Sequence, residues 1–329
     1  MSTPVTDDQR CSVVSARLDE PMPGTAPLAR AWLVLEQPGP YGRVALTESH
    51  FPASVGAALT AASEGTRTSV LLARTTGRHA DDGEAATSRR FWFAHSSPGG
   101  VRMRSGVIQD SVLLRPELPD LLREAGRGQL PPWGTKDGSP LLLVCTNSRR
   151  DRCCAIGGLP LAEGLAAGPH SARVLEVNHL GGHRFAPTAM LLPSANVFGR
   201  LDLAAATDVL DSALAGRLGA LTHLRGRTSA AAPAQAAAVA VRLAESVHGL
   251  DDIDVLRRSG EHVAAVPLSY VGEDGLARVE VRHRDGRAWT VLVRLVAGAL
   301  PDRSESCGKA ALAVASWVAD TPVPAAPWA

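Results

Sequence analysis

Two short segments of the sequence contain cysteine and histidine residues that could ligate a metal. Cys145 and Cys154 are separated by eight residues, and His179 and His183 are separated by three. Thiolates and imidazoles suit zinc or an iron–sulfur cluster, whereas magnesium and calcium take oxygen ligands. The two pairs together predict one centre with four ligands. Two thiolates and two imidazoles also describe a structural zinc site, so the ligand types leave both metals open.

The three other cysteines give weaker signals. Cys153 directly precedes Cys154, and adjacent cysteines rarely both ligate one centre, so Cys153 is retained as an alternative ligand. Cys11 and Cys307 lie far from both segments, and we interpret them as packing residues. An odd number of cysteines, three of them within ten residues, indicates metal or redox chemistry in a reducing compartment rather than a disulfide framework.

Two predicted strands are expected to bring the segments together. The apolar run Leu141–Val144 predicts a buried strand that leads into the first cysteine, and Arg173–Val177 predicts a second strand just before the histidines. Sites in α/β folds lie at the carboxyl ends of such strands. Gly181 and Gly182 argue against a helix across the histidine pair, because each costs about 1 kcal/mol relative to alanine. We therefore predict a loop that wraps the site.

The elements around this region complete a β-α-β-β-β-α order, which is that of a small thioredoxin-like domain spanning residues 138–222. Beyond the two strands above, they are a helix over Leu161–Ala167 with Pro160 at its first position, strands at Thr188–Leu192 and Asn196–Leu201, and a helix from the capping residue Asp202 to Leu214.

Two further regions are expected to flank this domain in a chain of α/β class with mixed sheets. Residues 1–130 predict a second α/β region of thioredoxin-like plan, with strands at Ala31–Glu36, Ser69–Leu72 and Arg90–Phe93 and a helix over Ser54–Ala62. Residues 235–329 predict a smaller α+β region that follows an Ala- and Pro-rich linker. Its elements are strands at Val263–Tyr270, Ala277–His283 and Ala288–Leu295, a turn at Asp285-Gly286 and a helix over Ala310–Val318.

Composition argues against several classes of function. The 34 basic and 33 acidic residues leave a formal charge of +1. A charge this small does not indicate binding to nucleic acid or to an anionic membrane. No apolar run approaches the roughly 20 residues of a membrane helix, and the polar N-terminus does not resemble a signal peptide. We therefore expect a cytoplasmic protein.

Longer sequence segments around the four candidate ligands resemble the sucrase/ferredoxin-like family, also described as thioredoxin-like ferredoxins of the bis-histidinyl type. The matching segments are CTNSRRDRCC from Cys145, HLGGHRFAPTAMLLP from His179, FGRLD from Phe198 and GTAPLARAWLVLEQPGPYGR from Gly24. The resemblance implies a [2Fe–2S] cluster on a thioredoxin-like domain, held by two cysteines and two histidines. In the family pattern an Arg-Asp pair precedes a ligand cysteine by two intervening residues, which here selects Cys154.

The function implied is electron transfer or redox sensing, with an unidentified redox partner protein. Nearby Arg150, Arg152 and Arg184 would favour reduction and would suit an acidic electron donor. Glycosidase activity is not supported, because no pair of carboxylates placed for sugar hydrolysis is marked in the sequence. Two alternatives stay open: a structural zinc protein, and a thiol–disulfide oxidoreductase that uses the vicinal cysteines.

Overall fold

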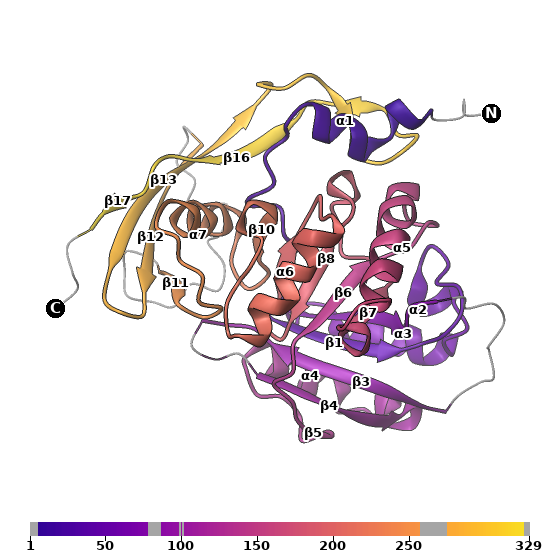
Figure 1. Ribbon diagram of the computed structural model, residues 1–329. Coiled ribbons are helices and arrows are strands. Elements are labelled where there is room, and N and C mark those ends of the chain that lie inside the picture. The colour runs from indigo at the N-terminus through magenta and orange to yellow at the C-terminus, as the bar shows by residue number, and fades with distance from the viewer. Residues whose placement is uncertain (1–5, 78–86, 99, 101, 257–274, 326–329) are drawn as a thin grey trace. The chain divides into compact units, whose positions relative to one another are not determined.

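The computed structural model describes residues 6–77, 87–98, 100, 102–256 and 275–325, and it divides into two compact units (Figure 1). Unit 1 contains residues 1–27, 181–188 and 196–329, and unit 2 contains residues 28–180 and 189–195. The sequence predicts three consecutive regions, whereas each compact unit combines segments that are far apart in the chain. The three regions therefore stay a prediction. Among the described residues, no helix is both long and apolar enough to cross a membrane.

Unit 2 is built on a mixed sheet with the strand order β8-β6-β7-β2-β1-β3-β4-β5. The pairs β1–β2 and β6–β7 are parallel, and the other neighbours are antiparallel. The strands are β1 (Ala31–Glu36), β2 (Thr68–Arg74), β3 (Ser88–His95), β4 (Arg102–Gln109), β5 (Thr135–Lys136), β6 (Leu141–Cys145), β7 (Val174–Val177) and β8 (Ala189–Leu192). The described helices are α2 (Ala45–Glu48), α3 (Ala53–Ser63), α4 (Leu118–Gly126) and α5 (Arg152–Ala166).

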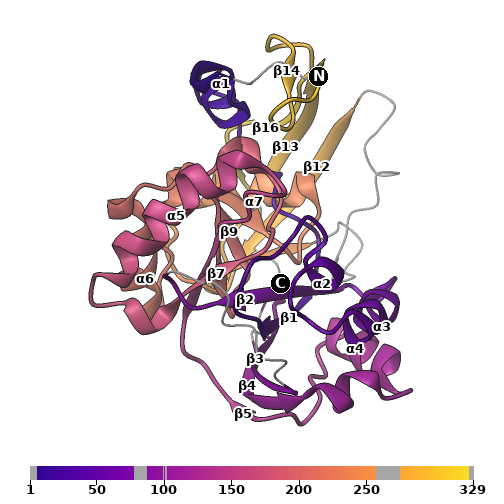
Figure 2. The ribbon, with the colours of Figure 1, turned by 90° about the vertical axis from the view of Figure 1, so that its right-hand side faces the viewer.

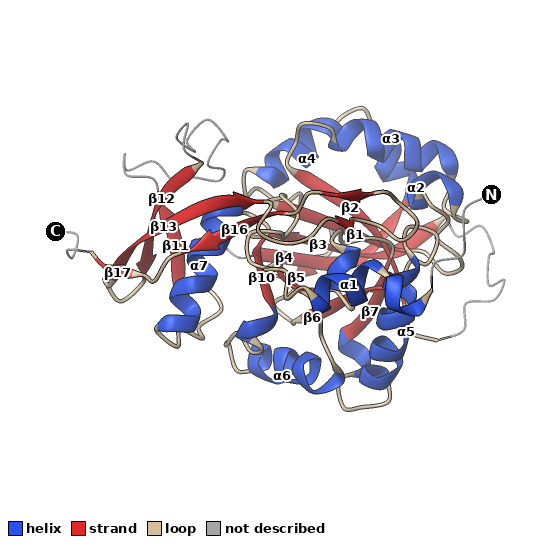
Figure 3. Ribbon diagram, turned by 90° about the horizontal axis from the view of Figure 1, so that it is seen from above, coloured by secondary structure: helices blue, strands red, loops and turns tan. Residues whose placement is uncertain are grey.

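Helices cover both sides of this sheet. A core of buried side chains from β1, β3, α3 and α4 includes Leu33, Leu59, Phe93 and Leu122. Helix α5 packs on β6 and β7, and Figure 3 shows it on the side opposite α3 and α4. Strands buried on both faces read as continuous apolar runs, which is why β1 and β6 were predictable.

The described part of unit 1 contains three smaller groups of strands. Strands β9 (Asn196–Phe198) and β10 (Leu224–Arg227) pair antiparallel. A second sheet has the order β11-β12-β13-β16, and β17 also pairs with β13. Its strands are β11 (Ile253–Leu256), β12 (Leu276–His283), β13 (Ala288–Ala297), β16 (Ala315–Ala319) and β17 (Val323–Pro324). The remaining elements are the ladder β14 (Arg303–Ser304) with β15 (Ala311–Leu312), and helices α1 (Cys11–Arg17), α6 (Leu203–Leu214) and α7 (Ala232–Ala244).

Most predicted elements of unit 1 are confirmed. Asp202 caps α6 through its Oδ1, which accepts a hydrogen bond from the Ala205 amide at 2.7 Å. Strands β12 and β13 form the predicted hairpin, in which Gly286 adopts φ +96° in the turn. The strand expected at Val263–Tyr270 lies outside the described residues.

Three predictions of local structure are wrong. The Ala- and Pro-rich stretch is not a linker, because α7 begins at Ala232 and buries Ala236 and Ala237 against the β12–β13 sheet. The helix expected over Ala310–Val318 is replaced by β15 and β16, since pairing with β13 outweighs the helical propensity of its alanines. The helix expected to begin at Pro160 begins eight residues earlier.

Candidate metal centre

Parallel pairing of β6 and β7 brings the cysteine and histidine segments to one edge of the sheet. Cys145 is the last residue of β6, and it lies in register with Val177, the last residue of β7. Both segments therefore leave the sheet at the same level. Asn178 fixes the start of the second loop, because its amide donates to the Leu72 carbonyl and its side chain accepts from the Leu72 amide. His179 follows directly.

The loop after Cys145 is held by hydrogen bonds to neighbouring backbone. The Thr146 amide donates to the Val177 carbonyl at 3.2 Å, which extends the alignment of the two strands. Asn147 donates through Nδ2 to the Gly42 carbonyl, and its Oδ1 accepts from the Arg149 amide. The polar residues of this loop therefore satisfy the backbone where the chain turns back toward α5.

Helix α5 starts inside the motif rather than after it. Asp151 is its N-cap, and the Asp151 side chain accepts a hydrogen bond from the Cys153 amide at 2.9 Å. This cap fixes the first turn, which contains Cys154. Pro160 lies within the helix, although a proline there removes one backbone hydrogen bond. The predicted start at Pro160 is therefore wrong, because the aspartate cap sets the start instead.

Close approach of α5 to the end of β6 depends on a glycine. A Cβ on Gly158 would lie 2.1 Å from the Cys145 carbonyl oxygen, far inside the contact distance of real side chains. Gly158 lies one helical turn after Cys154, on the same face of the helix. The absence of a side chain at Gly158 thus lets this face, with Cys154, lie directly against Cys145.

The metal-ligating atoms of Cys145, Cys154 and His179 all lie within 4.8 Å of one another. Both cysteines are 1% exposed. A hydrogen bond from the Cys154 thiol holds the pKa of Cys145 well below its ordinary value, against the effect of burial and with further help from His179 and the Leu180 amide. The same hydrogen bond, together with burial, raises the pKa of Cys154. The two buried sulfurs and the histidine are therefore close enough together to hold a soft metal ion.

The other two candidate ligands are placed differently. Cys153 is buried in the same turn of α5, but the three-residue group found among the described residues does not include it. His183 belongs to unit 1, where it begins the short 3-10 helix η4 (His183–Phe185). Gly181 and Gly182 both have φ near +70°, so the predicted loop between the histidines is confirmed.

A buried ion pair beside the site was not predicted. Glu176 is fully buried on β7, and its Oε2 accepts hydrogen bonds from Arg74 at 2.7 Å and from Thr146 Oγ1 at 2.9 Å. Arg74 also lies over the Tyr41 ring, 4.5 Å from its centroid. The sequence carries one signal of this pair, a glutamate inside the apolar strand that precedes His179.

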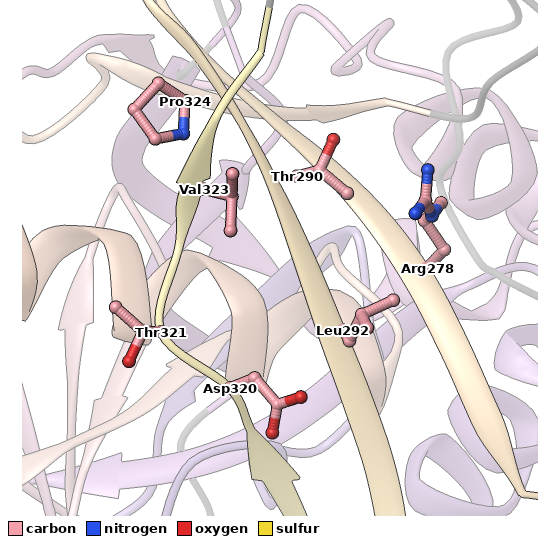
Figure 4. Close-up of a pocket in the computed structure, with 7 residues that line it drawn as sticks. All are labelled: Arg278, Thr290, Leu292, Asp320, Thr321, Val323 and Pro324. Atoms are coloured by element: carbon pink, nitrogen blue, oxygen red, sulfur yellow. The ribbon is translucent and has the colours of Figure 1, made fainter.

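A cavity elsewhere offers no comparable chemistry. Unit 1 has a cavity of about 310 Å³ on its second sheet, lined mainly by neutral side chains together with Arg278 and Asp320 (Figure 4). Asp320 already pairs with Arg294. The Cys145–Cys154–His179 group is therefore the stronger candidate site.

Comparison with known proteins supports the same region. A family model described as sucrase/ferredoxin-like matches residues 22–226, which is more than half of the chain. The chain belongs to the sucrase/ferredoxin-like family. The match includes the whole stretch from Cys145 to His183, so the resemblance predicted from the sequence is confirmed. No curated protein and no solved structure matches the chain.

Proposed function

We propose that this family member binds one [2Fe–2S] cluster through Cys145, Cys154, His179 and His183, and that it works in electron transfer or redox sensing. The convergence of two buried cysteines and one histidine at the ends of β6 and β7 carries the proposal. Membership of the sucrase/ferredoxin-like family supports it.

The donor set fits such a cluster. Iron–sulfur clusters are bound by thiolates, and imidazoles replace two of them in mixed-ligand centres. When bound, a cluster of this kind cycles by one electron at a higher potential than a cluster with four thiolates. The chain itself buries Cys145 and supplies a hydrogen bond from the Leu180 amide, which stabilises negative charge on the sulfur.

The choice of ligands has unequal support. The geometry favours Cys154 over Cys153, because only Cys154 belongs to the group with Cys145. The argument for His183 comes from the sequence: three residues separate it from His179, and two glycines leave the intervening loop free to curve. His183 is therefore proposed as the fourth ligand.

The partner is proposed to be an acidic redox protein. Arg149, Arg150 and Arg152 are exposed at the start of α5, within five residues of Cys154. Exposed cations of this kind speed the encounter with an acidic partner through long-range attraction. Arg184 is a weaker candidate than the sequence indicated, because it pairs with Glu20 at 2.8 Å.

Single alanine variants test the proposed ligands. Cys145→Ala and Cys154→Ala should abolish the visible absorption of the cluster, and His179→Ala should weaken it. Cys153→Ala is the matched control, because it removes a buried thiol from the same helical turn and should keep the absorption. The proposed ligands would be wrong if Cys153→Ala emptied the site while Cys154→Ala stayed coloured.

Metal content separates the proposal from its rivals. A zinc protein would be colourless and would lose zinc in the same variants, with no redox response. A thiol–disulfide enzyme would instead carry out disulfide exchange without metal, and chelation of iron would leave that activity unchanged. Either result would replace the iron–sulfur proposal.

A further inference from the structure

Two cysteines outside the candidate centre meet within unit 1. The Cys307 and Cys11 sulfurs lie 3.7 Å apart, although 295 residues separate them in the chain. Cys11 is the first residue of α1 and is 1% exposed, whereas Cys307 lies in the turn between β14 and β15 and is partly exposed. The two residues interpreted from the sequence as packing residues thus contact one another. Figures 1 and 2 show α1 beside the C-terminal segment that contains β14.

The segments that carry the two thiols are anchored to one another. Glu20, three residues after α1, accepts hydrogen bonds on both carboxylate oxygens from Arg303 of β14. Both side chains are almost fully buried. Bidentate pairs of this kind fix orientation as well as distance. The N-terminal segment is therefore fixed against β14, close to where Cys307 lies.

The turn that contains Cys307 has its own hydrogen bonds. Ser304 Oγ donates to the Lys309 carbonyl at 2.6 Å, and the Lys309 amide donates to the Ser306 carbonyl at 3.1 Å. Both bonds connect a residue that precedes Cys307 with Lys309, which follows it. The short sulfur–sulfur distance thus results from two ordered segments rather than from a loose loop.

We propose that Cys11 and Cys307 form a reversible disulfide, a second redox site separate from the candidate metal centre. A disulfide has a sulfur–sulfur bond of about 2.05 Å, so the sulfurs must approach by about 1.7 Å from their 3.7 Å separation. Rotation about χ1 moves each sulfur, and the Glu20–Arg303 pair holds the two segments that carry them. The inference does not depend on the proposed cluster.

The oxidant is a low-molecular-weight disulfide, and the exposure of the two thiols sets the order of steps. The Cys307 thiolate attacks one sulfur of the small disulfide, breaks its sulfur–sulfur bond and releases one thiolate. The Cys11 thiolate then attacks the Cys307 sulfur and releases the second thiolate. Two protein thiols are thus oxidised, one small disulfide is reduced to two thiols, and the two protons pass to the released thiolates. Cys307 goes first because Cys11 is buried.

The disulfide would affect the part of unit 1 that contains His183. Helix α1 packs against η4, which begins at His183, and Arg184 of η4 pairs with Glu20. A bond between Cys11 and Cys307 would hold α1 against β14 and β15 while α1 contacts η4. Oxidation is therefore expected to protect α1 from local opening, which proteolysis detects.

The test treats the full-length protein with oxidised glutathione and maps its peptides by mass spectrometry without reduction. The wild type should yield a Cys11–Cys307 linked pair that dithiothreitol removes, and the N-terminal segment should be cleaved more slowly by trypsin after oxidation. Cys11→Ser should stop at a mixed disulfide with one glutathione on Cys307. Cys307→Ser, the matched control, should leave Cys11 unmodified.

Several results would overturn the inference. Glutathione on Cys307 of the wild type without any linked pair is one such result, and a link from Cys307 to Cys153, Cys145 or Cys154 is another. Equal rates of alkylation of Cys11 and Cys307 in the untreated wild type would refute the order of attack, and this measurement needs no variant. Peptide mapping reports on each cysteine separately, so failure of the proposed cluster leaves this outcome readable.

Discussion

Substitution of Gly158 by alanine tests whether close packing of α5 on β6 builds the candidate centre. The new Cβ would lie 2.1 Å from the Cys145 carbonyl oxygen, and contacts under 3.0 Å are essentially never seen. Helix α5 must therefore move by about 1 Å, and overpacking of this kind costs roughly 1–3 kcal/mol. Alanine regains about 1 kcal/mol through its higher helix propensity. We expect a net loss of up to about 2 kcal/mol in the free energy of unfolding.

The same shift should damage the site more than the fold. Cys154 lies one turn before Gly158, so it moves with the helix away from Cys145. Metal–ligand distances tolerate deviations of only about 0.2 Å, and a 1 Å displacement is therefore expected to lower cluster occupancy sharply. Unfolding of the apo-protein in urea measures the first effect, and absorption per iron-reconstituted chain measures the second.

Gly138→Ala provides the control for this substitution. Gly138 is exposed in unit 2, and no atom lies within 4 Å of the position that its Cβ would take. It should keep the stability and occupancy of the wild type. If Gly158→Ala matched this control in both measurements, the proposed dependence of the site on α5 packing would be refuted.

Two further predictions concern the histidine loop and an acidic residue of unit 1. Gly182→Ala should lower the free energy of unfolding by more than the roughly 1–2 kcal/mol that a left-handed backbone costs a residue with a side chain. The loss should be larger because the new Cβ would also lie 2.3 Å from the Arg225 guanidinium. Urea unfolding that matches the wild type would contradict this prediction. Burial raises the pKa of Glu20, but its hydrogen bond with Arg303 and the charge of Arg184 outweigh burial and hold the pKa below 4.5. A lowered pKa gives stability above pH 4.5 that is lost as the pH falls through the folded-state pKa. Glu20→Gln should therefore make the free energy of unfolding depend less on pH in the acid range. An unchanged acid profile would count against a stabilising Glu20–Arg303 pair.

The parts of the fold that were predictable have local causes. Ala31–Glu36 and Leu141–Val144 are continuous apolar runs, and a strand buried on both faces needs such a run. Asp202 signals its helix because a side-chain oxygen caps the first turn. The approach of Cys145 and His179 was predictable, because the strands before them end at one edge of a sheet.

The failures have tertiary causes. Pro160 indicated a helix start, but the Asp151 cap nine residues earlier was the stronger signal. The segment from Ala310 to Val318 has helical composition, and only the presence of β13 makes its second half a strand. The Arg74–Glu176 pair and the approach of Cys11 to Cys307 join residues about 100 and 300 positions apart, which no periodicity in the sequence can reveal.

The most direct test of the central proposal is the metal and sulfide content of the freshly purified protein, handled without oxygen, together with its visible spectrum. A mixed-ligand [2Fe–2S] centre predicts a red-brown protein with about two iron and about two acid-labile sulfides per chain, bleached by dithionite and absent in Cys145→Ala. A colourless protein with about one zinc per chain after growth in iron-replete medium would contradict the proposal and would assign the site to structural zinc.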